Sequence, residues 1–196
     1  MGLGELSIKE YVGRLAGESR EYLKLAAEDL ERVRSVWPSL SKEVNPIISG
    51  VLNSLASNKE ALEIAKKAGL SLERASELFH QWFRMVFEEN YDEGHALKLF
   101  RIGLAHAKHG VSEKLMILTM GAFMGETLQA LKGLQATGEV ENSICKCFFW
   151  NLCIMLQSYD FSRQSSFSKA TGISKQLFER LVRLKADEIY EQLEKV

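Results

Sequence analysis

The positions of the prolines constrain this chain most. The 196 residues contain only two, Pro38 and Pro46, so residues 47–196 lack the strongest helix breaker. Proline inside a helix removes a backbone hydrogen bond and clashes with the preceding turn. Leu, Ala, Glu and Lys, which favour helices, are plentiful, and no Asn-Gly turn separates alternating strands. The sequence therefore predicts an all-α protein.

Capping residues divide the chain into about eight helices with apolar residues at helical spacing. Ser7, Ser71 and Ser112 each precede such a segment, as N-cap residues do, and glycines 69 and 110 each follow one. We expect the first helix to end at Gly17 and Pro38 to interrupt the second and open the third. Serine-rich residues 162–168 are expected to separate a C-terminal amphipathic helix from the rest.

Two of the four histidines lie in RIGLAHAKHGV, residues 101–111. His106 is at the edge of the apolar side of its helix, and small neighbours would let a planar group approach it: Gly103, Ala105 and Ala107. His109 precedes Gly110 and is expected to be a helix-end residue. A lone histidine at such an edge is also compatible with a satisfied boundary residue, so the residues alone leave both interpretations open. His95 is expected to help cap its helix, and His80 lies beside a bulky apolar stripe.

The string IGLAHAKHGVSEKLMILTMGAF, residues 102–123, resembles the signature of the sensor globins, a family of globin-coupled sensors and protoglobin-like single-domain relatives. His106, Gly110-Val111 and Ala122-Phe123 fall in register with it. Residues 23–60 are similar to the opening helices of the family, and FFWNLCIMLQSYDFSRQ is similar to its terminal helix. The resemblance implies a sensor-globin domain over residues 20–163, preceded by an extension helix in 1–19 and followed by an amphipathic helix in 164–196.

The resemblance implies a globin fold that binds haem b, with His106 as the iron ligand and a backbone carbonyl near Ile102 orienting its ring. A diatomic gas (oxygen, carbon monoxide or nitric oxide) would bind at a five-coordinate iron, for sensing or carriage. The residues implied to contact the haem are mostly apolar: Leu52, Leu55, Ala75, Leu78, Phe79, Trp82, Ile102 and Met116.

This chain departs from the family pattern on the side where the gas would bind. Val51-Leu52 stands where many relatives have a tyrosine, and Leu78 or Ala75 occupies the facing polar position. On the side of the implied haem that faces His106, Leu115-Met116 replaces the Trp-Tyr pair that is usual in the family. Because a hydrogen-bond donor stabilises oxygen more than carbon monoxide, we expect weak oxygen retention. The same losses are compatible with an alternative, a haem-free globin-fold module that binds signalling proteins.

Composition narrows the class of partner. A formal net charge of −1 gives no electrostatic reason to expect nucleic acid, and no apolar run is long enough to span a bilayer. The three cysteines lie between residues 145 and 153 without CxxC spacing, which favours free thiols in the cytoplasm. No GxSxG, phosphate-loop or HExxH motif indicates an enzyme. A homodimer through the last long helices and a signalling protein partner are the expected interactions.

Overall fold

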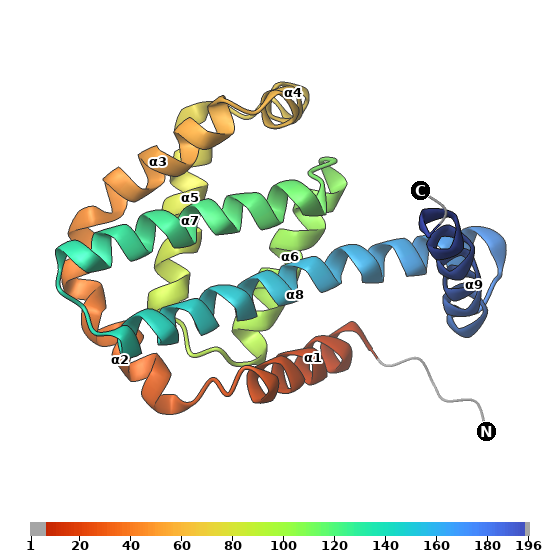
Figure 1. Ribbon diagram of the computed structural model, residues 1–196, viewed down its shortest axis with the longest axis horizontal. Helices are drawn as coiled ribbons and strands as arrows, with labels where there is room; N and C mark the ends of the chain where they lie inside the picture. Colours follow the sequence, from red (N-terminus) through yellow and green to blue (C-terminus); the bar gives the residue numbers. More distant parts are fainter. Residues whose placement is uncertain (1–6, 195–196) are drawn as a thin grey trace.

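The computed structural model describes residues 7–194, so the ends of the two terminal segments, residues 1–6 and 195–196, lie outside it (Figure 1). The described residues form nine α-helices, one short 3-10 turn and no β-strand, which confirms the all-α prediction. The helices are α1 (Ile8–Tyr22), α2 (Ala27–Leu40), α3 (Val44–Ala56), α4 (Lys59–Ala68), α5 (Leu72–Glu88), α6 (Glu93–Lys108), α7 (Glu113–Gly133), α8 (Gly138–Thr171) and α9 (Lys175–Leu193).

The predicted serine caps are present. The side chains of Ser7, Ser71 and Ser112 each accept a hydrogen bond from the backbone N–H three residues later, at 3.2 Å. Gly69 and Gly110 follow their helices with φ of 63° and 75°, a conformation that costs a glycine little. Local chemistry therefore sets these helix ends.

Two predicted boundaries are wrong. Gly17 does not end α1, which continues to Tyr22, and the chain first adopts a positive φ at Lys24 (50°). Pro38 does not open a new helix, because it lies in the last turn of α2, and α3 begins only after the 3-10 turn Ser41–Glu43. A proline this close to the end of a helix removes a single backbone hydrogen bond, which the short remainder of α2 tolerates.

The expected break at residues 162–168 is also wrong, because this segment is helical and belongs to α8. Phe161 packs on Tyr11 and Phe100 with ring centroids 5.1 and 5.6 Å away, and Phe167 packs on Phe178 at 4.9 Å. These contacts hold the helix just before the serine-rich segment, at Phe161, and within it, at Phe167. α8 ends instead at Thr171, before Gly172 with its φ of 70°.

The helices cross in layers, with α7 and α8 running over α5 and α6 (Figure 1). α6 packs most extensively on α8, while α3 packs on α7 and α1 lies against α6 and α8. An aromatic cluster from α2, α5, α7 and α8 fills the centre: Trp37, Phe83, Phe87, Phe123 and Phe148. This arrangement brings the helices of the predicted site, α3, α5, α6 and α7, into one body.

Candidate functional site

His106 lies in the last turn of α6, with its ring Nδ1 2.8 Å from the carbonyl oxygen of Ile102. A carbonyl oxygen only accepts, so Nδ1 carries the proton and donates it, as the sequence analysis expected. Nε2 then keeps its lone pair, and it makes no hydrogen bond within residues 7–194. Helical spacing fixes this orientation, because His106 and Ile102 are four residues apart.

The surroundings of His106 favour its neutral form. Burial lowers the pKa of His106 because the charged ring loses solvation; the hydrogen bond to Ile102 opposes this, and His109 adds to it. A neutral imidazole with a free Nε2 is the form in which histidine binds a metal. His106 can therefore act as a metal ligand without first losing a proton at neutral pH.

His109 is exposed and caps the end of α6 through its backbone N–H, as predicted for a helix-end residue. The two neighbouring histidines therefore differ in their surroundings: the ring of His106 is partly buried and hydrogen-bonded, whereas His109 is exposed. His80 is held by two hydrogen bonds, between Nδ1 and Ser76 O and between Nε2 and Asn45 Oδ1, both 2.8 Å long. His95 does not cap its helix with its side chain; Asp92 does, by accepting from the His95 N–H at 2.9 Å.

Gly103 has a different role from the one predicted. A Cβ added there would lie 2.2 Å from Ser158 Oγ and 2.3 Å from Met155 O, so this glycine allows α6 to approach α8. The prediction that it makes room beside His106 for a planar group is wrong. Ala107 is partly buried and Ala105 is exposed. Sequence spacing did not distinguish a surface for a ligand from a surface for a neighbouring helix.

The predicted contact residues come from four helices and differ in burial. Met116 on α7 lies in the core, and Leu78 on α5 is 40% exposed. The other six are partly buried: Leu52 and Leu55 on α3, Ala75, Phe79 and Trp82 on α5, and Ile102 on α6. Their common contact with a haem stays a prediction.

Two of these residues meet at Phe123. Its ring packs edge-on against those of Phe79 and Trp82, with centroid distances of 5.1 and 4.9 Å. Trp82 also packs against Phe148 of α8 at 5.8 Å. Phe123 and Phe148 were not among the predicted contact residues. Phe123 is the last residue of the signature string 102–123, and this position could have indicated that it belongs to the site.

The helices α5 and α6 do not pack closely against each other over the described residues, although both pack on α8. The side chains of Phe79 and Trp82 lean onto α7 and α8 instead. The indole Nε1 of Trp82 is buried and has no hydrogen-bond partner within residues 7–194. The predicted contact set thus contains one buried hydrogen-bond donor, which the sequence-based expectation of a mostly apolar site did not include.

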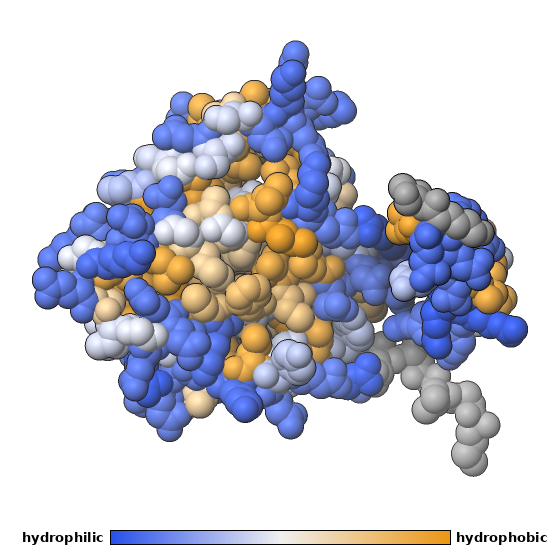
Figure 2. Space-filling view, in the orientation of Figure 1, coloured by the Kyte–Doolittle hydropathy of each residue, from blue (hydrophilic) through white to orange (hydrophobic). Residues whose placement is uncertain are grey.

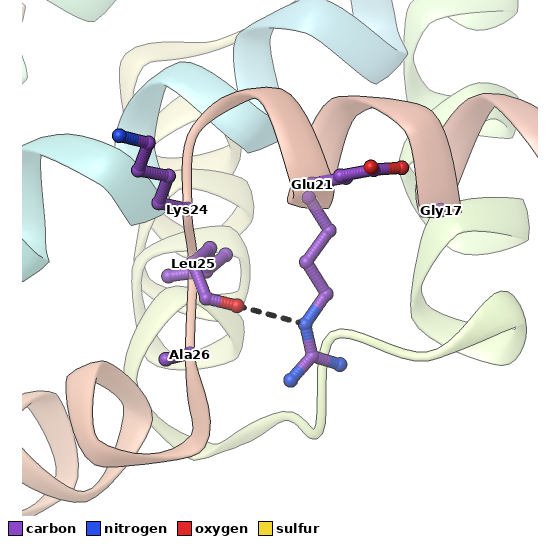
Figure 3. Close-up of a pocket in the computed structure, with 6 residues that line it drawn as sticks. Gly17, Glu21, Lys24, Leu25 and Ala26 are labelled. Carbon is purple, nitrogen blue, oxygen red and sulfur yellow. Dashed lines mark hydrogen bonds between the residues drawn. The ribbon is translucent and has the colours of Figure 1, made fainter.

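Two surface pockets lie away from the predicted site. Figure 3 shows a shallow pocket of about 400 Å³ at the end of α1, lined by Gly17, Arg20, Glu21, Lys24, Leu25 and Ala26. Arg20 Nε donates to Leu25 O at 3.0 Å there, closing the turn toward α2. A second pocket of about 370 Å³ lies between α3 and α7. Neither contains a residue of the predicted site.

Outside the predicted site, the sequence contains three cysteine thiols. Cys147 is buried and Cys145 and Cys153 are partly buried, and all three are free thiols. Burial raises the pKa of Cys147 to about 12, so this thiol does not ionise at neutral pH.

Residues 7–194 hold no cluster of three or more His, Cys, Asp or Glu side chains able to bind a metal ion. No helix in that range is long and apolar enough to cross a membrane.

Comparisons with known proteins agree with the sequence resemblance. The model of the Protoglobin family matches residues 15–162. Among solved structures, the globin domain of a Geobacter sulfurreducens globin-coupled sensor is similar, with a TM-score of 0.68 and 22% sequence identity. The match covers 73% of this chain and 96% of that domain. At this identity the structural likeness shows a globin fold. No curated protein matches the sequence.

Proposed function

Since the chain belongs to the Protoglobin family, we propose that it binds haem b through His106 and a diatomic gas at the iron. The observation that carries this proposal is the state of His106. Its Nδ1 donates to Ile102 O at 2.8 Å, and burial favours the neutral ring, so Nε2 is available to a metal. Haem needs only one ligand from the protein side, because the porphyrin supplies four nitrogens.

The remaining residues suit an apolar cofactor. Leu52, Leu55 and Phe79 are only partly buried, so apolar surface is left uncovered on α3 and α5. The loose approach of α5 to α6 is compatible with a flat group between them. Once bound, haem supplies reversible coordination of a gas, while the protein holds the iron ligand, excludes water and sets the polarity nearby.

We propose binding with weak oxygen retention rather than catalysis. Leu52, Ala75 and Leu78 carry no hydrogen-bond donor, and a single neutral hydrogen bond contributes on the order of 1 kcal/mol to retention of a polarised ligand. Trp82 Nε1 is the one buried donor without a partner in the predicted set, within residues 7–194. The two hydrogen bonds of His80 argue against its becoming a second iron ligand.

A homodimer through α7 and α8 is part of the proposal. Ile117, Leu118 and Phe149 on these helices are 48%, 57% and 52% exposed, and nothing lies above Gly121 or Gly125. Figure 2 shows apolar residues gathered over this face. Exposed apolar patches of this kind mark interfaces. A signalling protein is the other expected occupant. We place the chain in the cytoplasm, where its free thiols would stay reduced.

The alternative, a haem-free interaction module, has one observation in its favour. Phe79 and Trp82 of α5 each pack edge-on against Phe123 of α7, and these side chains fill part of the space between α5 and α7. A globin domain that closes in this way needs no cofactor to complete its core. The two functions differ in what the protein does when haem is offered.

Haem titration separates them. Apoprotein is mixed with ferric haem and the Soret band is recorded for the wild type, His106→Ala and His109→Ala. We expect a sharp band at one haem per chain in the wild type and in His109→Ala, because His109 is exposed and caps its helix through its backbone. His106→Ala should lose it. A wild type that gains no band, while circular dichroism shows it folded, supports the haem-free alternative.

A further inference from the structure

Trp82 differs from the other two tryptophans of the chain in the hydrogen bonding of its indole. Trp37 Nε1 donates to Glu88 Oε1 at 2.9 Å. Trp150 Nε1 donates to a backbone carbonyl of α1 at 3.1 Å. Trp82 Nε1 is buried and has no partner in the described part of the chain. An indole N–H can only donate, and a buried donor without an acceptor is unfavourable, so a ligand that brings an acceptor would be stabilised here.

The side of α5 that carries Trp82 also carries other members of the predicted contact set. Ala75, Phe79 and Trp82 follow one another at spacings of four and three residues, so they lie on one side of the helix. The Trp82 ring packs on Phe123 of α7 and Phe148 of α8. α7 and α8 run over α5 in Figure 1, so the indole lies on the inner side of α5, where it contacts both of these helices.

The surroundings of the Trp82 indole restrict which acceptor it can meet. The aromatic rings packed against it belong to Phe83, Phe123 and Phe148, with centroids 4.9 to 6.4 Å away, and none of them carries a charge. A carboxylate, such as those that haem carries, would lose its hydration there, and a single hydrogen bond does not offset that loss. A small uncharged acceptor fits better, and a diatomic gas and water both meet this description. Only the gas would make the hydrogen bond depend on the ligand at the iron.

We propose that Trp82 Nε1 donates a hydrogen bond to the bound gas and thereby sets how strongly the protein favours oxygen over carbon monoxide. This inference rests on the proposed binding of haem through His106. Bound oxygen is polarised, so a donor stabilises it more than it stabilises carbon monoxide. No other member of the predicted contact set has a hydrogen-bond donor in its side chain. A single neutral donor also agrees with weak oxygen retention.

The C–O stretching frequency of the carbon monoxide complex tests this contact. A donor that faces the bound gas lowers the frequency, because it draws electron density into the ligand. Wild type, Trp82→Phe and the control Trp37→Phe are loaded with haem, reduced and saturated with carbon monoxide, and their Soret and infrared bands are recorded. We expect Soret bands of equal intensity and a higher C–O frequency in Trp82→Phe than in the wild type. Trp37→Phe should show no shift, since the N–H that it loses donates to the exposed Glu88.

Gas release is the second measurement. Oxygen should dissociate about three to ten times faster from Trp82→Phe than from the wild type, while carbon monoxide release changes by less than about twofold. Equal acceleration of both gases would assign the effect to the bulk of the indole and overturn the proposal. An unchanged C–O frequency with unchanged oxygen release would also overturn it, although haem binding would stand. A folded wild type that gains no Soret band rejects haem binding itself, so the two failures are distinguishable.

The wild type provides a test that needs no substitution at position 82. The variants Trp37→Phe and Trp150→Phe each remove one indole N–H resonance from the ¹⁵N spectrum, so the remaining resonance belongs to Trp82. The carbon monoxide and oxygen complexes of haem are both diamagnetic and have the same ring current, so the two spectra are comparable. We expect the Trp82 N–H resonance to move downfield when oxygen replaces carbon monoxide. The same position in both complexes would mean that the gas does not accept this hydrogen bond, and would overturn the proposal.

Discussion

The buried His95 makes stability depend on pH in a way that can be measured. Its side chain is 1% exposed, between the rings of Tyr91 and Trp150 at centroid distances of 4.8 and 5.3 Å. Neither ring nitrogen has a hydrogen-bond partner within residues 7–194. Burial lowers the pKa of His95 from 6.5 to about 4, because the charged ring would lose its hydration without gaining a partner. Glu89 opposes this shift only partly.

The direction of the pH dependence follows from whether the folded or the unfolded chain binds the proton. Above pH 6.5 the ring is neutral in both the folded and the unfolded chain, so His95 adds no pH dependence. Between pH 6.5 and about 4 only the unfolded chain binds the proton, and the free energy of unfolding falls as the pH falls. At about 1.4 kcal/mol per pH unit the full loss is about 3 kcal/mol. Below pH 4 both states are protonated and the loss stops growing.

Urea denaturation of the wild type and His95→Phe, at several pH values from 7.5 to 4.5, measures this effect. Phenylalanine keeps an aromatic ring beside Tyr91 and Trp150 but binds no proton. We expect the wild type to lose about 2 to 3 kcal/mol more than the variant across this range. His106, whose pKa burial also lowers, acts in the same direction in both proteins and cancels. Parallel stability curves for the two proteins would refute the assignment of a neutral, unpartnered His95.

Three further predictions concern packing, a buried charge and gas selectivity. Gly103→Ala should destabilise the fold by at least about 2 kcal/mol in thermal melts, because its Cβ would meet an α8 backbone carbonyl at 2.3 Å; the control Gly17→Ala, with nothing within 4 Å, should raise stability by about 0.5–1 kcal/mol. Asp29→Ala should cost about 3 kcal/mol in urea melts, because it leaves the Lys146 ammonium, now 2.9 Å from the carboxylate, without its partner; a loss below 1 kcal/mol would contradict this. Leu52→Tyr should slow oxygen dissociation several-fold in stopped-flow measurements and change carbon monoxide release little; equal changes for both gases would place Leu52 away from the gas.

Features set by neighbouring residues were predictable from the sequence. The caps at Ser7 and Ser112 depend on a side chain and a backbone N–H three residues away, so the local sequence is enough to predict where these helices begin. The family signature singled out His106 as a candidate ligand, which stays a prediction, and the hydrogen bond between its ring and the carbonyl of Ile102 follows from their spacing of four residues.

Features set by tertiary contacts were not predictable. The serines of residues 162–168 suggested a break, but α8 continues, with Phe161 packed on Tyr11, far away in the sequence, and Phe167 packed on Phe178 of the next helix. Gly103 suggested space for a ligand, whereas the backbone of α8 occupies that side. The burial of His95 likewise depends on Trp150, more than fifty positions later in the chain.

Imidazole rescue tests the role of His106 most directly. His106→Gly and the control His109→Gly are mixed with haem, and spectra are recorded with and without added imidazole. If the Nε2 of His106 is the iron ligand, His106→Gly should lose the wild-type spectrum and regain it when imidazole enters the vacated position, while His109→Gly should keep it throughout. A His106→Gly protein whose haem spectrum matches that of the wild type without imidazole would contradict ligation by His106.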